Sequence, residues 1–67
     1  MADNESLWRV IYIAHSASAA RQVEQILSSE GFLVRIRQAE RESALYELLA
    51  LESEAREARA FIMEKGF

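Results

Sequence analysis

The first hydrophobic run of the chain lies between Leu7 and Ala14, where Arg9 alone interrupts the sequence LWRVIYIA. A short run of β-branched, aromatic and aliphatic residues predicts a largely buried β-strand. Its two faces carry alternate residues: Leu7, Arg9, Ile11 and Ile13 on one, and Trp8, Val10, Tyr12 and Ala14 on the other. We expect Ile11 and Ile13 to face the core.

Helical spacing follows the strand. Apolar residues recur at Ala19, Val23, Ile26 and Leu27, and polar residues fill the opposite side, which predicts an amphipathic helix of about four turns. After this helix, FLVRIR alternates as a half-buried strand does, with one face of Phe32, Val34 and Ile36 and the other of Leu33, Arg35 and Arg37. A strand, helix and strand of this length predict a right-handed crossover between two parallel strands, with room for a third strand between them.

Both ends of the predicted helix carry recognisable signals. Ser16 or Ser18 can cap its N-terminus by accepting a hydrogen bond from a free backbone N–H group. Gly31 suits the left-handed position just after the helix, because it has no Cβ atom, and Phe32 would then contact Leu27.

The segment from Ala39 onward allows two interpretations. Every residue before Gly66 tolerates a helix, so propensity alone predicts one long helix. The sequence LYELLAL also fits a strand over 45–51, followed by a second helix that begins at 52–54 with the acidic residues Glu52 and Glu54 in its first turn. Its apolar stripe would be Ala55, Ala58 and Ile62. We favour strand and then helix.

Three stretches, VIYIA, ILSSEGFLVRIR and LYELLALESEAREA, resemble a family of small uncharacterised bacterial domains described as signal-transducing. The resemblance implies an α+β, two-layer βαββα fold: a truncated ferredoxin-like or PII-like sheet of three strands, order 1-3-2, with two helices on one face. The prolines of two family turns are missing, at Ala14-His15-Ser16 and at Ala50-Leu51-Glu52. We expect a disordered N-terminus over 1–6, one domain over 7–67, and a hairpin near 38–43.

Composition narrows the function. The net charge is −3, which disfavours binding to nucleic acid, and no apolar run is long enough for a membrane span. The chain contains no cysteine, as expected of a cytoplasmic protein. Some relatives in the family carry a glutamate decarboxylase label, but that chemistry needs a Schiff-base lysine in an enclosed site, and the only lysine is Lys65 near the chain end. We therefore expect no enzyme activity, no cofactor and no metal.

Two binding functions remain. The strand-to-helix loop could bind a small anion, as in a PII-like sensor, through His15, Ser16 and Ser18. The other function is a regulatory or protein-interaction module, acting as a homodimer or with another protein, because a two-layer fold covers only one face of its sheet. We place Trp8, Val10, Tyr12, Tyr46 and Leu48 on that uncovered face. Arg35 and Arg37 either bind an acidic partner or a nucleotide, or pair with Glu47. The candidate interaction residues are Trp8, Val10, Tyr12, Arg35, Arg37 and Tyr46.

Overall fold

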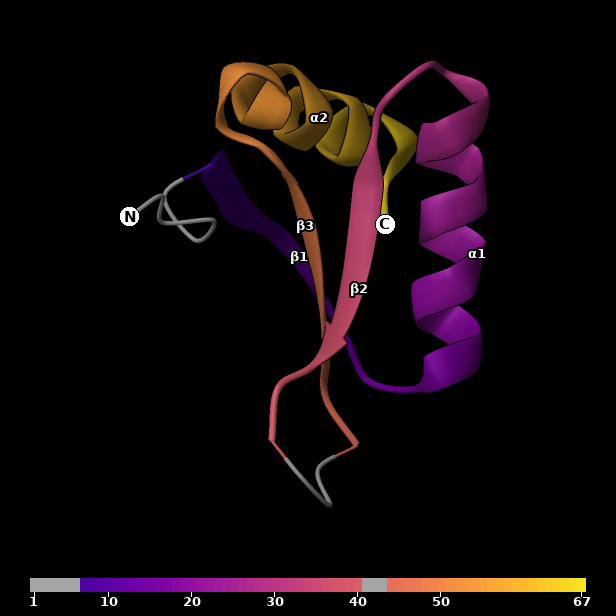
Figure 1. The fold of residues 1–67 in the computed structure, drawn as a ribbon. Coiled ribbons are helices and arrows are strands. Elements are labelled where there is room, and N and C mark those ends of the chain that lie inside the picture. Colours follow the sequence, from indigo (N-terminus) through magenta and orange to yellow (C-terminus); the bar gives the residue numbers. More distant parts are fainter. Residues whose placement is uncertain (1–6, 41–43) are drawn as a thin grey trace.

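The computed structural model describes residues 7–40 and 44–67 and arranges them as strand, helix, strand, strand and helix (Figure 1). The elements are β1 (Trp8–Ala14), α1 (Ala17–Ser29), β2 (Val34–Gln38), β3 (Tyr46–Leu51) and α2 (Glu52–Lys65). The predicted βαββα order is therefore confirmed. The predictions of a disordered segment over 1–6 and of a turn near 38–43 fall wholly or partly outside the described residues.

The sheet has the predicted strand order, β1-β3-β2. β3 lies in the middle and is antiparallel to both neighbours, so β1 and β2 run parallel to each other. The helix α1 makes the crossover between these two parallel strands, and both helices cover the same face of the sheet (Figure 1). At the base of the β2–β3 connection, the N–H of Ala39 donates to the carbonyl of Leu45 at 2.9 Å.

The C-terminal part of the chain is a strand followed by a helix, and the single long helix is excluded. Leu48 and Ala50 on one side of β3 are fully buried against the helices, and this burial stabilises the extended conformation of the segment. The helix α2 begins at Glu52, with Glu52 and Glu54 in its first turn. Negative charges at that end are stabilised by the helix dipole.

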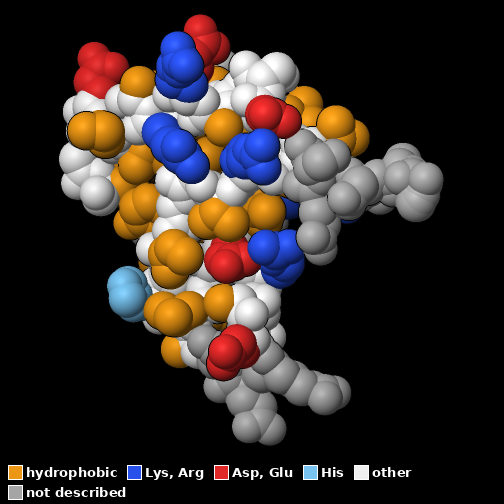
Figure 2. Space-filling model, turned by 90° about the vertical axis from the view of Figure 1, so that its left-hand side faces the viewer, with side chains coloured by type: hydrophobic (Ala, Val, Ile, Leu, Met, Phe, Trp, Pro, Cys, Tyr) orange, Lys and Arg blue, Asp and Glu red, His pale blue; other side chains and the backbone are white. Residues whose placement is uncertain are grey.

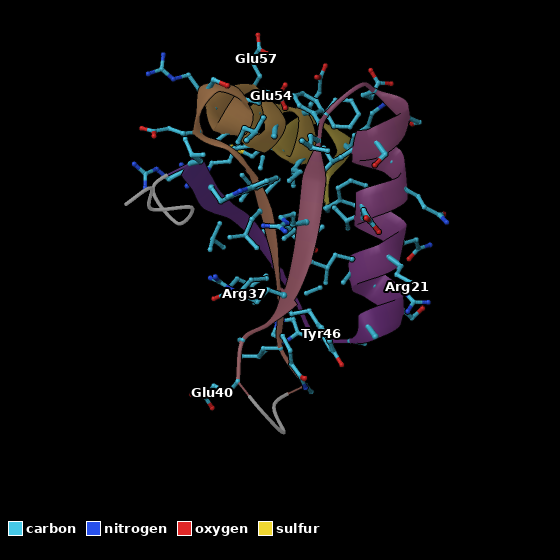
Figure 3. All side chains as sticks on the ribbon, in the orientation of Figure 1. Arg21, Arg37, Glu40, Tyr46, Glu54 and Glu57 are labelled. Carbon is cyan, nitrogen blue, oxygen red and sulfur yellow. The ribbon has the colours of Figure 1, made fainter. Side chains whose placement is uncertain are left out.

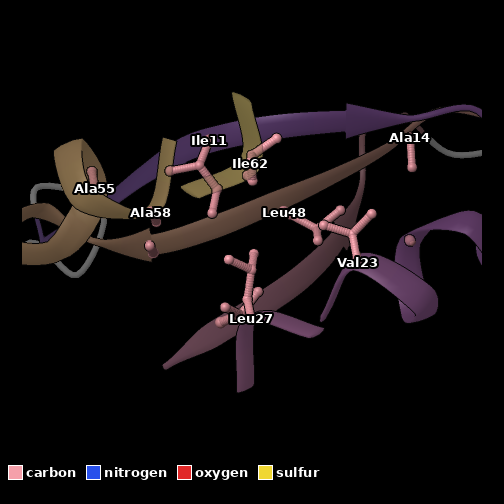
Figure 4. Packing of buried hydrophobic residues seen from close by; sticks show 11 residues of the cluster. Ile11, Ala14, Val23, Leu27, Leu48, Ala55, Ala58 and Ile62 are labelled. Atoms are coloured by element: carbon pink, nitrogen blue, oxygen red, sulfur yellow. The ribbon is translucent and has the colours of Figure 1, made fainter. Parts of the chain in front are cut away.

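The core lies between the sheet and the two helices (Figure 4). From α1 it takes Ala20, Val23 and Leu27, and from α2 Ala55, Ala58 and Ile62. The strands contribute Ile11, Ala14, Val34, Leu48 and Ala50. The apolar stripe predicted for α2 is confirmed, because all three of its residues are buried.

A β-bulge changes the face assignment of β1. The pairing register with β3 shifts between Val10 and Tyr12, which leaves Ile11 as an extra residue. Ile11 is buried as predicted, but the prediction for Ile13 is wrong, because its side chain is 43% exposed and Ala14 takes the next core position. An extra residue reverses the alternation of every side chain that follows it.

The end of α1 forms the cap that the sequence predicts. Gly31 has a positive φ of 97°, and its N–H donates to the carbonyl of Ser28. The N–H of Phe32 donates to the carbonyl of Leu27 at 3.1 Å, which completes a Schellman motif. The Phe32 ring packs against the core cluster that contains Leu27.

Replacing Gly31 with valine is expected to lower the free energy of unfolding by about 1 kcal/mol or more. A Cβ atom at this position would meet no other atom within 4 Å, so the loss comes from the positive φ alone. Urea denaturation followed by circular dichroism measures it. Gly31→Asn is the control and should lose less, since asparagine tolerates the left-handed region. Equal losses for both variants would contradict this explanation.

Candidate functional site

The face of the sheet that neither helix covers is the first candidate site, and we call it the open face. In β3, the residues between the buried core positions point to this face. The residues directly opposite them on β1 and β2 point to it as well. These residues are Trp8, Val10, Ile13, Arg35, Arg37, Glu47, Leu49 and Leu51. Figure 2 shows the molecule from the side away from α1, where hydrophobic side chains lie among basic and acidic ones.

A stacked pair of side chains, Arg35 and Trp8, lies on the open face. The guanidinium carbon of Arg35 lies 4.9 Å from the centre of the Trp8 ring, within the range of a cation–π contact. Leu49 lies directly opposite both Val10 and Arg35 in the sheet. It is only 6% exposed although no helix covers it. The open face therefore has an ordered centre.

Arg37 and Glu47 form an ion pair on the same face. Nε and one terminal nitrogen of Arg37 donate to Oε1 of Glu47, at 2.9 and 2.6 Å. The two residues are direct partners across β2 and β3, which confirms the cross-strand pairing considered from the sequence. Arg35 differs: its contact is with Trp8, and it forms no ion pair with any of the described residues.

Tyr12 and Tyr46 lie on the helix side of the sheet, which corrects the face expected for them. The bulge places Tyr12 opposite Leu48, a core residue, and both tyrosines pack against the core cluster. The ring of Tyr12 also meets the edge of Phe67, with centres 6.3 Å apart. Figure 3 shows Tyr46 on the side of the sheet that faces α1 and Arg37 on the opposite side. Leu48, also expected on the open face, is fully buried in the core.

Exposed apolar side chains lie at both ends of the open face. Ile13 lies opposite Glu47 near the end of β1. Leu33, directly before β2, has the parity of Arg35 and is 56% exposed. Sequence reasoning missed Leu49 and Leu51 as members of this face. The alternation of side chains along β3 could have identified them, because Glu47, Leu49 and Leu51 are two residues apart and point to the same face.

The two edges of the sheet differ in their protection. On β1, the bulge interrupts the pairing, and a terminal nitrogen of Arg59 in α2 donates to the carbonyl of Val10 at 3.0 Å. Bulges and charged side chains both hinder the addition of a further strand. On β2, the pairing with β3 is regular from Val34 to Gln38. The β2 edge is therefore the more regular of the two.

The strand-to-helix loop is the second candidate site, and the structure gives its residues ordinary roles. Ser16 is the N-cap of α1, and its Oγ accepts a hydrogen bond from the N–H of Ala19 at 3.0 Å. His15 and Ser18 are exposed. The three residues lie close together at the start of α1. Of the two serine hydroxyls, that of Ser16 is already used to cap the helix.

Replacing Ser16 with alanine is expected to lower the free energy of unfolding by about 1 kcal/mol, because the Ala19 N–H loses its side-chain acceptor. Thermal unfolding followed by circular dichroism measures the change. Ser18→Ala, in the first turn of the same helix, is the matched control and should change stability by less than about 0.5 kcal/mol. A larger loss from Ser18→Ala would show that the cap is misassigned.

Comparison with known proteins adds no relative: no protein-family model matches the chain, and no match was found among curated proteins or solved structures. The family resemblance noted in the sequence stays a prediction. Within residues 7–40 and 44–67, no group of three or more histidine, cysteine, aspartate or glutamate side chains gathers in a way that could hold a metal ion. No helix in these ranges is long and apolar enough to cross a membrane.

Proposed function

We propose that this chain is a non-catalytic protein-interaction module that binds its partner through the open face. The observation that carries the proposal is the combination of the Arg35–Trp8 stack and the buried Leu49 on one sheet face with the exposed apolar side chains of Ile13 and Leu33 at the two ends. Apolar surface of this kind, mixed with arginine and tryptophan, is typical of interaction sites. If the partner's activity changes on binding, the module has a regulatory role.

A second copy of the chain is one candidate partner. A chain of 67 residues buries only about 60% of its unfolded surface, and pairing with another subunit would bury more. Most such pairs are two-fold symmetric, and their stability rises with protein concentration. The anion-sensor function and the cytoplasmic location both stay predictions, and the use of Ser16 as a helix cap favours the interaction module over the sensor.

Site-specific photo-crosslinking in the source cells tests the proposal. A photoreactive amino acid replaces Ile13 on the open face or Leu33 at its end, directly before β2, and Arg21 serves as the control position. Arg21 is exposed on α1 and points away from the sheet (Figure 3). The proposal expects a discrete crosslinked product from the two open-face positions and none from position 21. Equal products from all three positions, or none from any, would refute it.

Sedimentation equilibrium of the purified chain, from micromolar to millimolar concentration, identifies the partner class. An apparent mass that doubles over this range, together with a crosslinked product of twice the chain mass, indicates a second copy. A monomer throughout, with a heavier crosslinked product, indicates a different protein.

A further inference from the structure

We infer that the partner segment is acidic and extended, and that it adds to the outer edge of β2 with a carboxylate bound to Arg35. This inference rests on the proposed function and names the chemistry of the partner. It combines three features of the structure: an arginine held in position by an aromatic ring, an edge strand with regular pairing, and an excess of positive charge on one face of an acidic chain.

The first feature is the guanidinium of Arg35. Its contact with Trp8 uses the ring face, and among the described residues none of its N–H groups donates a hydrogen bond. Stacking restricts the side chain without occupying its donors, so less entropy is lost when a ligand binds. A planar carboxylate is the group that this fork of donors matches best.

The second feature is the direction of the backbone groups of β2. The hydrogen bond from Ala39 to Leu45 marks a bonded pair, and bonded and non-bonded pairs alternate along antiparallel strands. The N–H and C=O groups of Arg35 therefore point toward β3, and those of Val34 and Ile36 point to the outer edge. An added strand would pair with these outer groups. Every second side chain of that strand would then stand beside Arg35 or Arg37 on the open face.

The third feature is charge. The open face carries two arginines and one glutamate, an excess of one positive charge, while the whole chain has a net charge of −3. Glu47 already pairs with Arg37, which leaves Arg35 as the cation available to a partner. A symmetric pair of open faces would place like charge near like charge, whereas an acidic segment is complementary. Charge therefore favours an acidic partner over a second copy.

A titration followed by nuclear magnetic resonance tests this inference on the intact chain. The probe is a short capped peptide that alternates glutamate and valine, and the control peptide has lysine in place of glutamate. The glutamate peptide should shift the amide signals of β2, with the largest changes at Val34 and Ile36, at roughly millimolar concentration or below. The lysine peptide should not bind.

Arg35→Gln should weaken binding of the glutamate peptide by about tenfold or more, as expected for the loss of a charge-assisted hydrogen bond. Arg21→Gln, an exposed arginine on the far side of α1, should leave it unchanged. Arg35→Glu should reverse the preference, so that the lysine peptide binds instead. Circular dichroism confirms that each variant is folded.

Three results of the titration would overturn the inference: no binding at millimolar peptide, shifts outside β2, or equal binding to the Arg35→Gln variant. A fourth would be an oligothymidylate, a single-stranded nucleic-acid probe, that binds as tightly as the glutamate peptide. The crosslinking experiment gives an independent outcome. If crosslinks arise from the open face and the peptide does not bind, the interaction module stands and the acidic partner is rejected. If neither occurs, both proposals fall.

Discussion

Replacing Leu48 with alanine is expected to lower the free energy of unfolding by about 3 kcal/mol, within the roughly 2 to 5 kcal/mol found when a leucine is removed from a well-packed core. Leu48 is fully buried in the central strand and belongs to the cluster in which the sheet meets the helices. A chain of 67 residues has a total stability of roughly 3 to 10 kcal/mol, so this one change removes much of it.

Chemical denaturation with urea measures the loss, and the midpoint of thermal unfolding should fall by more than about 12 °C in a domain of this size. Leu33→Ala is the matched control, because it removes the same atoms from a leucine that is 56% exposed. Its effect should stay within about 0.5 kcal/mol. Similar losses for Leu33→Ala and Leu48→Ala would contradict the burial that the structure assigns to these two leucines.

Replacing Ala58 with glutamate is expected to unfold the chain at 25 °C. Ala58 is fully buried on the side of α2 that faces the sheet, next to Ala55 and Ile62. A carboxylate at this position would lose its water without gaining a partner, and the added volume would push α2 away from the sheet. A cost of several kcal/mol, roughly 3 or more, approaches the whole stability of so small a domain.

Ala60→Glu provides the control in the same helix, because Ala60 is exposed and glutamate is a good helix former. This variant should fold with nearly unchanged stability. Far-ultraviolet circular dichroism and the dispersion of amide signals distinguish the two outcomes. A folded Ala58→Glu variant, as stable as the parent, would show that α2 does not pack on the sheet through this face.

Much of the architecture could be predicted because local and global signals agree. The spacing of Val23 and Leu27 identified α1, and Gly31 marked its end, as the Schellman motif confirms. The alternation over Tyr46–Leu51 outweighed helix propensity in a stretch where every residue tolerates a helix. Tertiary contacts explain that result: an extended β3 fills the gap between β1 and β2 and pairs on both sides.

The candidate site was only partly predictable, because the side chains of a strand keep strict alternation only while its pairing is regular. Trp8, Val10, Arg35 and Arg37 do share the open face. Tyr12 and Tyr46 lie on the helix side. For Tyr12 the reason is the bulge at Ile11, which no sequence signal announced. For Tyr46 the reason is that the helices cover the face of β3 that carries Leu48 and Ala50, which Tyr46 shares, and not the face that carries Leu49.

The sequence by itself determined the order of the elements, the helix boundaries at Gly31 and Glu52, and the stripes that the two helices bury, and it limited the cap of α1 to Ser16 or Ser18. These features depend on periodicity and capping, which act between residues close together in the chain. The tertiary structure decided which parity of each strand meets the helices, which edge is regular, and that the Arg35 side chain stacks on Trp8. These depend on contacts between residues far apart in sequence, where the insertion of a single residue reverses a face.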